Sequence, residues 1–168
     1  MQELRDLVAE IPDFPKPGIL FRDIGPLLRS HFDATVTALD ALFSESEWHA
    51  VDAVAGIESR GFILAAALAD RRRKGFVPVR KKGKLPPPVV DVAYELEYGS
   101  GVLEMQTGSG CLLLIDDVLA TGGTLGASAT LSRQAGYTLC GLGVLLDLGF
   151  VPGFRCHELE ARSVLKYG

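Results

Sequence analysis

The sequence predicts an α/β fold: a mainly parallel central sheet with helices on both faces, plus a β-hairpin flap. Strands and helices alternate along the chain from residue 51 onward. Residues 112–115 and 139–148 are rich in apolar side chains throughout, as strands covered on both faces should be. At 168 residues and 48% hydrophobic content the chain can build one sizeable core, so we expect a single domain over residues 1–168.

The first elements are a short helix and an irregular segment. Apolar residues from Leu4 to Ile11 follow helical spacing, and Pro12 ends that helix. The stretch PDFPKPGILFRDIGP, residues 12–26, holds four of the nine prolines, which excludes a regular helix or a central strand. We expect a loop there, either ordered or disordered, with enough apolar side chains to be tied down.

Residues 32–79 predict a helix, a strand, a second helix and a second strand. Val36 to Phe43 carry one apolar helical face, and residues 51–56 form a short strand. The segment FILAAALADRRRKG has an apolar body and a basic last turn, which complements the negative end of a helix. Gly75 is expected to take the left-handed cap of this helix, and residues 76–79 to form the next strand.

A two-stranded flap is predicted over about residues 84–105. Residues 90–98 alternate between apolar and polar side chains, the period of a strand with one polar face. Gly99 and Gly101 turn the chain before the alternation resumes. A helix from about residue 124 to 135, capped by Gly136, and the strand at 139–148 follow.

The composition excludes several classes of protein. The net charge is −4, and the basic cluster at 71–74 is explained by its helix end, so we expect no nucleic-acid partner. No stretch approaches the roughly 18 apolar residues of a membrane span, and the N-terminus is not typical of a signal sequence. The three cysteines fit neither a disulfide framework nor a zinc site, and the three histidines are scattered. These features predict a cytoplasmic protein with no membrane partner.

The stretch CLLLIDDVLATGGT, residues 111–124, combines a buried strand, two acids and two glycines between threonines. Ligands of parallel sheets bind beyond the carboxyl ends of the strands, and free backbone amides before a helix can hold a phosphate. Carboxylates there would repel a phosphate unless they face sugar hydroxyls or a magnesium ion on a polyphosphate. A ribose phosphate carrying a metal-bound pyrophosphate satisfies every group. The residues assigned to it here are Asp116, Asp117, Ala120, Thr121, Gly122, Gly123 and Thr124.

This pattern resembles the phosphoribosyl pyrophosphate motif of the type I phosphoribosyltransferases, usually two hydrophobic residues, two acids, a short spacer and TGGT. Neither a dinucleotide-binding loop nor a G-x-x-x-x-G-K-[ST] loop is present. Four further segments resemble adenine phosphoribosyltransferases, with similarity from about residue 11 to residue 146. They are FPKPGILFRDIGPLL (14–28), GIESRGF (56–62), VPVRKKGKLP (77–86) and YELEYG (94–99).

The resemblance implies purine salvage: transfer of phosphoribose from phosphoribosyl pyrophosphate to adenine, giving AMP and pyrophosphate, with magnesium and as a homodimer. The base-binding segment would span about residues 12–28, with Leu20, Phe21 and Arg22 lining the adenine site. Ser59 and Arg60 would face the pyrophosphate. The departing pyrophosphate leaves a sugar cation, so positive groups must stabilise the leaving anion. The further candidates are Arg80, Lys81 and Lys84, although such a basic run is often only a solvated loop.

The flap is suitably placed to act as a lid, which the reaction needs because water would capture an exposed sugar cation. In the family, the glutamate and tyrosine of the LEYG block approach the reacting centre when the flap closes. Glu97 is therefore the candidate to take the proton from the attacking purine nitrogen, and Tyr98 to cover the site. The alternative for Glu97 is the polar face of an exposed hairpin.

Two alternative functions share the phosphate-binding motif. A xanthine or orotate phosphoribosyltransferase would have the same motif, but the FRDI and SRGF segments argue against it. A non-catalytic module that senses phosphoribosyl pyrophosphate would need a DNA-binding extension, for which we expect no room before Phe14. The similarity weakens after Asp147, so the sequence assigns no role to the C-terminal segment.

Overall fold

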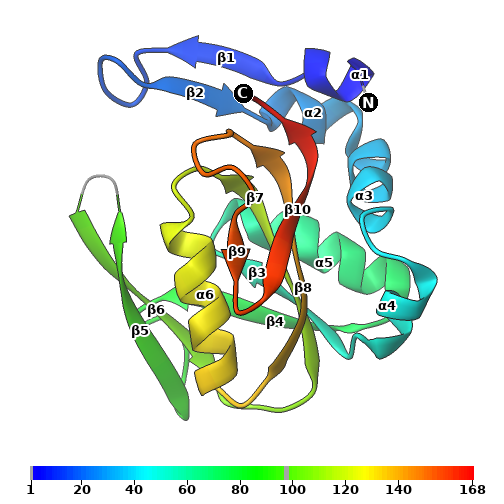
Figure 1. Ribbon diagram of the computed structural model, residues 1–168, viewed down its shortest axis with the longest axis vertical. Helices are drawn as coiled ribbons and strands as arrows, with labels where there is room; N and C mark the ends of the chain where they lie inside the picture. The colour runs from blue at the N-terminus through cyan, green and yellow to red at the C-terminus, as the bar shows by residue number, and fades with distance from the viewer. Residues whose placement is uncertain (1, 97–98) are drawn as a thin grey trace.

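The computed structural model describes residues 2–96 and 99–168. Within this part of the chain, eight strands form one sheet in the order β5-β6-β4-β3-β7-β8-β10-β9, and β1 and β2 form a separate pair (Figure 1). The strands are β1 (Ala9–Pro12), β2 (Leu20–Asp23), β3 (Ala53–Ile57), β4 (Gly75–Lys81), β5 (Val89–Leu96), β6 (Gly99–Gln106), β7 (Cys111–Leu119), β8 (Thr138–Asp147), β9 (Arg155–Cys156) and β10 (Leu159–Lys166). The helices are α1 (Gln2–Asp6), α2 (Gly25–Ser30), α3 (Phe32–Asp40), α4 (Glu45–Ala50), α5 (Arg60–Arg72) and α6 (Gly123–Gln134).

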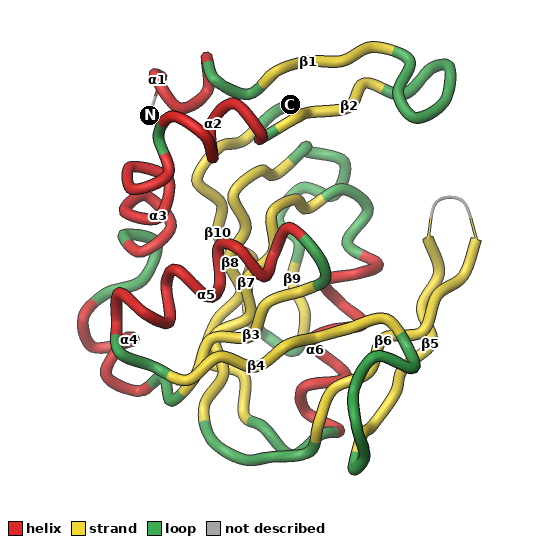
Figure 2. Tube along the Cα trace, turned by 180° about the vertical axis from the view of Figure 1, so that it is seen from behind, coloured by secondary structure: helices red, strands yellow, loops and turns green. Residues whose placement is uncertain are grey.

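The centre of the sheet is parallel, since β3 pairs in parallel with β4 and β7, and β8 with β7 and β10. The flap strands join antiparallel at one edge, where β6 pairs with β4 and β5. Figures 1 and 2 show α5 and α6 on opposite faces of the sheet. Leu64 and Leu68 of α5 pack into one core cluster, and Leu125 and Leu131 of α6 into the other. The predicted mainly parallel sheet with helices on both faces and a hairpin flap is confirmed.

The N-terminal segment differs from the prediction. Helix α1 ends at Asp6, and the residues that were expected to continue it form β1, which pairs antiparallel with β2. Asp13 accepts a hydrogen bond from the amide of Gly18 (2.7 Å), and Phe14 packs edge-on against Phe21 with ring centroids 5.2 Å apart. Residues 13–19 of the proline-rich stretch thus form the turn of a hairpin, and residues 20–23 form its second strand, where a loop was expected. The exclusion of this stretch from the central sheet was correct.

The helix boundaries also needed correction. Helix α3 ends at Asp40, before the expected Phe43, and α2 and α4 were not predicted. Arg73 holds the left-handed cap of α5 at φ 53°, whereas Gly75 is already paired with β3 at the start of β4. Arg72 pairs with Asp40 (2.5 Å) and Glu45 (2.8 Å), so this part of the basic cluster ties helices together.

The C-terminal segment, which the sequence did not assign, completes the sheet. Strand β10 runs parallel beside β8, and β9 folds back on β10. The chain end therefore lies near β2 and α2 in Figure 1. Among the described residues, no helix is both long and apolar enough to cross a membrane.

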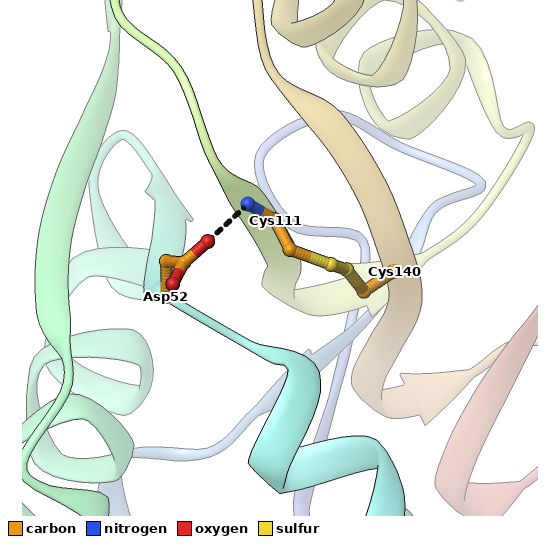
Figure 3. Close-up of a disulfide and its surroundings, with 3 residues drawn as sticks. All are labelled: Asp52, Cys111 and Cys140. Atoms are coloured by element: carbon orange, nitrogen blue, oxygen red, sulfur yellow. Dashed lines mark hydrogen bonds between the residues drawn. A yellow bond between two sulfur atoms is a disulfide. The ribbon is translucent and has the colours of Figure 1, made fainter.

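The expectation that the cysteines form no disulfide is wrong for two of them. Cys111 at the start of β7 is bonded to Cys140 on β8, 29 positions later, with their Cα atoms 5.7 Å apart (Figure 3). The register of β7 on β8 shifts between Leu112 and Leu113, which leaves Cys140 as an extra residue beside Cys111. The two cysteines are far apart in the sequence, but the neighbouring strands β7 and β8 bring them together. Cys156 is free.

Candidate active site

A cavity of about 340 Å³ opens beyond the carboxyl ends of β3 and β7. Ligand sites of open parallel sheets lie at this edge. Every residue that the sequence assigned from the phosphate motif and from the SRG turn lines this cavity. These residues are Ser59, Arg60, Asp116, Asp117, Ala120, Thr121, Gly122, Gly123 and Thr124. Segments far apart in the sequence thus meet in one site.

The loop between β7 and α6 is shaped for close approach of a ligand. Gly122 has φ 84°, a left-handed conformation that favours glycine, and a Cβ there would collide with the ring of Phe154. Helix α6 begins at the next residue, and the amide of Gly126 donates to the carbonyl of Gly122 (2.8 Å). The amides before it are left for a ligand, at the positive end of the helix. This arrangement is suited to a phosphate group.

The two acids at the end of β7 are buried, each with 6% of its surface exposed. Burial raises the pKa of Asp116 well above its usual range, and the charge of Asp117 adds to the shift. Burial also raises the pKa of Asp117, against the opposing effect of Arg60. A Cβ on Gly61 would lie 2.8 Å from Asp116 Oδ1, so glycine is needed at the start of α5.

Arg60 connects two parts of the site. Its Nη2 lies 2.7 Å from Asp117 Oδ2, and its guanidinium lies 5.2 Å from the ring centre of Phe21 on β2. Asp117 Oδ2 is buried, and the Arg60 guanidinium is its charged partner. A ligand that draws Arg60 away would have to bring a hydroxyl or a cation to this oxygen, because a buried carboxylate without a partner is costly.

Comparisons with known proteins agree with this geometry. A family model described as the phosphoribosyl transferase domain matches residues 34–149. The chain belongs to this family. It is similar to the adenine phosphoribosyltransferase of Hydrogenovibrio crunogenus, with 49% identity covering 98% of this chain and 96% of that protein. The resemblance of the sequence motifs to phosphoribosyltransferases is therefore confirmed.

Solved structures of phosphoribosyltransferases share the fold. The adenine phosphoribosyltransferase of Rhodothermus marinus has a TM-score of 0.84 and 39% identity, covering 98% of this chain and 97% of that one. The Saccharomyces cerevisiae enzyme, solved in complex with an imino-altritol bisphosphate and adenine, has a TM-score of 0.86 and 35% identity. That match covers 96% of this chain and 95% of the yeast chain.

The basic residues assigned to the pyrophosphate of a phosphoribosyltransferase do not all line the cavity. Arg80 Nε donates to Glu58 Oε2 (3.2 Å), and the amide of Lys81 donates to the same oxygen (3.0 Å). Against the effect of burial, the Lys81 amide and then Arg80 hold the pKa of Glu58 below its usual range. The amide of Lys84 donates to Glu104 (2.6 Å). Roles of these three basic side chains in binding stay predictions.

The residues assigned to the base lie on β2 and do not line the cavity, which β2 reaches through the contact of Phe21 with Arg60. Leu20 is 44% exposed, and Phe21 faces Arg60 as described. The guanidinium of Arg22 is engaged by Glu10 (3.1 Å) and by the ring of Tyr167, 4.1 Å from its centre. Glu97 and Tyr98 lie outside the described residues, so their assignment also stays a prediction.

Two residues at the site, and one buried acid on the flap strand β6, were missed from the sequence. Glu58 lines the cavity and holds Arg80, and Phe154 closes against the phosphate loop. Glu104 is 3% exposed, and hydrogen bonds from backbone amides, Gly83 first, lower its pKa. Glu58 stands next to the SRG turn and could have been found. Phe154 lies in the segment after Asp147, where no motif pointed to it.

Proposed function

We propose that this chain transfers phosphoribose from phosphoribosyl pyrophosphate to adenine, giving AMP and pyrophosphate. The observation that carries the proposal is the cavity itself, in which the amides of residues 120–124 lie beside a buried acid pair and Arg60. A pentose bearing a phosphate and a pyrophosphate offers an acceptor or donor for each of these groups. The full-length similarity to adenine phosphoribosyltransferases supports adenine as the base.

The 5-phosphate of the sugar would bind the amides of Ala120 to Thr124, because these amides lack helical partners. Asp116 and Asp117 would accept hydrogen bonds from the sugar hydroxyls, which relieves the repulsion between two buried carboxylates. Arg60 would move its charge from Asp117 to the pyrophosphate. As the bond to pyrophosphate breaks, that charge stabilises the leaving anion more than the ground state.

The base would be held by β2, with Phe21 as the aromatic side chain against which adenine stacks. The flap, β5 and β6, would close over the sugar and exclude water from the cation-like transition state. Glu97, which follows β5 in the sequence, is our candidate to accept the proton from the attacking nitrogen, and Tyr98 to cover the site.

Magnesium fits the site as an ion held mainly by the substrate. Among residues 2–96 and 99–168, no group of three or more metal-ligating side chains is assembled. Once Arg60 turns to the pyrophosphate, the buried Asp117 Oδ2 would be an oxygen suited to a hard cation. Asp116 and Asp117 would hold the ion together with the pyrophosphate, whose developing charge it would neutralise.

We further infer a homodimer in the cytoplasm, as the family resemblance suggests. Half-exposed apolar side chains such as Ile63 on α5 and Phe76 on β4, exposed by 45% and 40%, would gain from being covered. Sedimentation equilibrium tests the subunit count. A bond such as Cys111–Cys140 is unusual in a reducing compartment, so thiol labelling of protein lysed under acid quench tests its state in cells.

The decisive experiment offers the protein phosphoribosyl pyrophosphate, magnesium and one base at a time. The bases are adenine, guanine, hypoxanthine, xanthine and orotate, and the readout is pyrophosphate release. Release with adenine alone, or with adenine far above the others, is expected. Preference for xanthine or orotate would show that this base, and not adenine, is the substrate. Tight binding of phosphoribosyl pyrophosphate with no release for any base would favour a sensing module.

A further inference from the structure

The hairpin that carries the proposed base site is joined to the rest of the fold without backbone pairing to the described strands of the main sheet. Strands β1 and β2 pair only with each other and share no ladder with the eight-stranded sheet, as described for residues 2–96 and 99–168. Phe14, Ile11 and Leu20 on this hairpin are exposed by 51%, 40% and 44%. Backbone pairing therefore does not fix the position of β2 relative to the cavity, and side-chain contacts must do so.

One of these contacts comes from the other end of the chain. The ring of Tyr167 lies between two guanidinium groups, with Arg5 of α1 at 4.5 Å and Arg22 of β2 at 4.1 Å from its centre. We call these three side chains the Tyr167 clamp. Figure 1 shows the C-terminus beside β2 and α2. Both distances are within the range of a cation–π interaction.

Tyr167 is itself held firmly. Its amide donates to the carbonyl of Asp147 at the end of β8 (2.8 Å), and Arg5 donates to the carbonyl of Lys166 (2.6 Å). The ring also packs against the main core cluster. It therefore offers a fixed surface to a hairpin whose two ends are held in the core by Val8 and Ile24 but whose strands, among those described, pair only with each other.

Arg22 depends on this surface. Its side chain is only 15% exposed, and its Nε is buried without a hydrogen-bond acceptor. Burying a charged group is costly unless partners compensate, and the aromatic face supplies such compensation beside the ion pair with Glu10. Without the ring, the guanidinium would gain by moving into water, and the backbone of β2 would move with it.

A shift of β2 reaches the base site directly. The neighbouring residue Phe21 faces Arg60, 5.2 Å from its ring centre, and Arg60 contacts Asp117. The phosphate loop, by contrast, belongs to β7 and α6 and makes none of the contacts of the clamp. Loosening the hairpin should thus weaken binding of the base more than binding of the sugar phosphates.

We propose that Tyr167 is a positioning residue that holds β2, through Arg22, in the pose that binds the purine. The proposal rests on the proposed function for the identity of the base, but the anchoring itself is a property of the free protein. No motif in the sequence pointed to Tyr167.

The test compares three variants with the unchanged chain. Tyr167→Ala removes the ring, and Tyr167→Phe keeps the ring and removes only the hydroxyl. Tyr137→Ala is the matched control, because it also removes a partly buried tyrosine ring, at the start of β8 and away from the hairpin. Steady-state kinetics give KM for adenine, KM for phosphoribosyl pyrophosphate, and kcat. Hydrogen exchange of the backbone amides of β1 and β2 is measured without substrate.

Tyr167→Ala should raise KM for adenine about 10-fold, with little change in KM for phosphoribosyl pyrophosphate, and should speed exchange in β1 and β2 to a similar extent. Tyr167→Phe and Tyr137→Ala should behave like the unchanged chain in these measurements. Equal increases of both KM values, or an equally damaged Tyr167→Phe, would overturn the proposal. Unchanged exchange in the hairpin of Tyr167→Ala would overturn it as well.

The clamp can still be tested if adenine is not the substrate. If the unchanged chain uses another base, KM is measured for that base, and the exchange data decide on the clamp. If no base is used, the exchange experiment alone tests the clamp, since it needs no substrate. Faster exchange in the hairpin of Tyr167→Ala would then support the anchoring, and unchanged exchange would overturn it.

Discussion

The two ends of strand β7 differ in how their polar groups are satisfied. At the amino end, Cys111 is bonded to Cys140, its amide donates to Asp52 (2.7 Å), and its carbonyl accepts from the Asp52 amide (2.9 Å) (Figure 3). At the carboxyl end, Asp116 and Asp117 are buried side by side, and the single guanidinium of Arg60 faces the two carboxyls, paired with Asp117. One end is complete in the free protein, and the other is left to be completed by a ligand.

This difference shows how one strand serves both stability and function. A buried like-charge pair weakens the free fold, and such local costs persist where the surrounding structure compensates for them. The buried leucines of β7 and the covalent bond at its start are that compensation. Substitutions at the amino end should therefore lower stability and leave ligand binding unchanged. Substitutions at the carboxyl end should weaken ligand binding and raise the stability of the free protein.

The largest effect is expected at the amino end. Replacing Cys111 and Cys140 by serine opens a loop between positions 29 apart, which contains the phosphate loop and α6. The loss should be about 3–4 kcal/mol of unfolding free energy, and the melting temperature should fall by roughly 10 °C. Differential scanning calorimetry measures it, with Cys156→Ser as the control that leaves the bond intact. Equal melting temperatures for all three proteins would mean that the bond contributes nothing.

At the carboxyl end we expect weaker ligand binding together with a more stable free protein. Asp116→Asn with Asp117→Asn should weaken magnesium-dependent binding of phosphoribosyl pyrophosphate by at least ~2 kcal/mol, or about 30-fold, because two contacts lose their charge. The melting temperature of the free protein should rise by about 2–4 °C, since a buried repulsion is removed. Titration calorimetry and thermal unfolding measure the two quantities. Unchanged affinity would show that the two acids do not contribute to binding phosphoribosyl pyrophosphate.

The same variant has a pH dependence with a definite sign. Burial raises the folded-state pKa of both carboxyls, so their charged forms destabilise the free fold above the raised pKa values. The gain in melting temperature should be full above the raised pKa values. It should shrink as the pH falls through the raised pKa values and vanish below the ordinary aspartate range. A gain that grew with acidification would contradict the assignment of the shift.

A smaller effect is expected in the loop that follows the acids. Gly122→Ala forces an alanine to φ 84° against the ring of Phe154, which should cost about 1–3 kcal/mol of stability and lower affinity for the phosphate. Gly126→Ala, one turn into α6, is the matched control, because its Cβ would meet Phe154 at an ordinary 3.7 Å. The control should be neutral or slightly stabilising, as alanine favours helix. Thermal unfolding of both variants measures the loss of stability. Equal losses for the two variants would rule out the left-handed conformation of Gly122 as the cause.

The smallest effect is expected for Asp52 at the amino end. Asp52→Ala removes the acceptor of the Cys111 amide and should cost about 1 kcal/mol, without changing affinity for phosphoribosyl pyrophosphate. Asp52→Asn keeps a side-chain acceptor and should lose less. Urea unfolding compares the two variants. A larger loss for Asp52→Asn would exclude the hydrogen bond as the cause.

The sequence predicted those parts of the molecule that are continuous along the chain. The apolar run of β7 and the loop up to Thr124 form a single stretch, so strand, acids and phosphate loop could be recognised together. The helix after the loop was predicted with its Gly136 cap, and the flap from its alternating side chains. The SRG turn was found as a separate block, and the parallel order of β3 and β7 then brought Arg60 to Asp117.

What the sequence did not predict depends on register and on distant partners. The Cys111–Cys140 bond requires a one-residue shift between β7 and β8. The hairpin of β1 and β2 was hidden by prolines, which mark a loop but do not exclude an isolated pair of strands. Tyr167 matters only because the chain end returns to β2, which no local pattern encodes.

The central claim is that the amides of Ala120 to Thr124 bind the phosphate of a pentose whose hydroxyls face Asp116 and Asp117. A crystal structure of the protein with AMP tests it most directly. The account predicts the phosphate within hydrogen-bond distance of those amides, the ribose hydroxyls on the two acids, and the base against Phe21. A nucleotide bound elsewhere, with the loop empty, would contradict it.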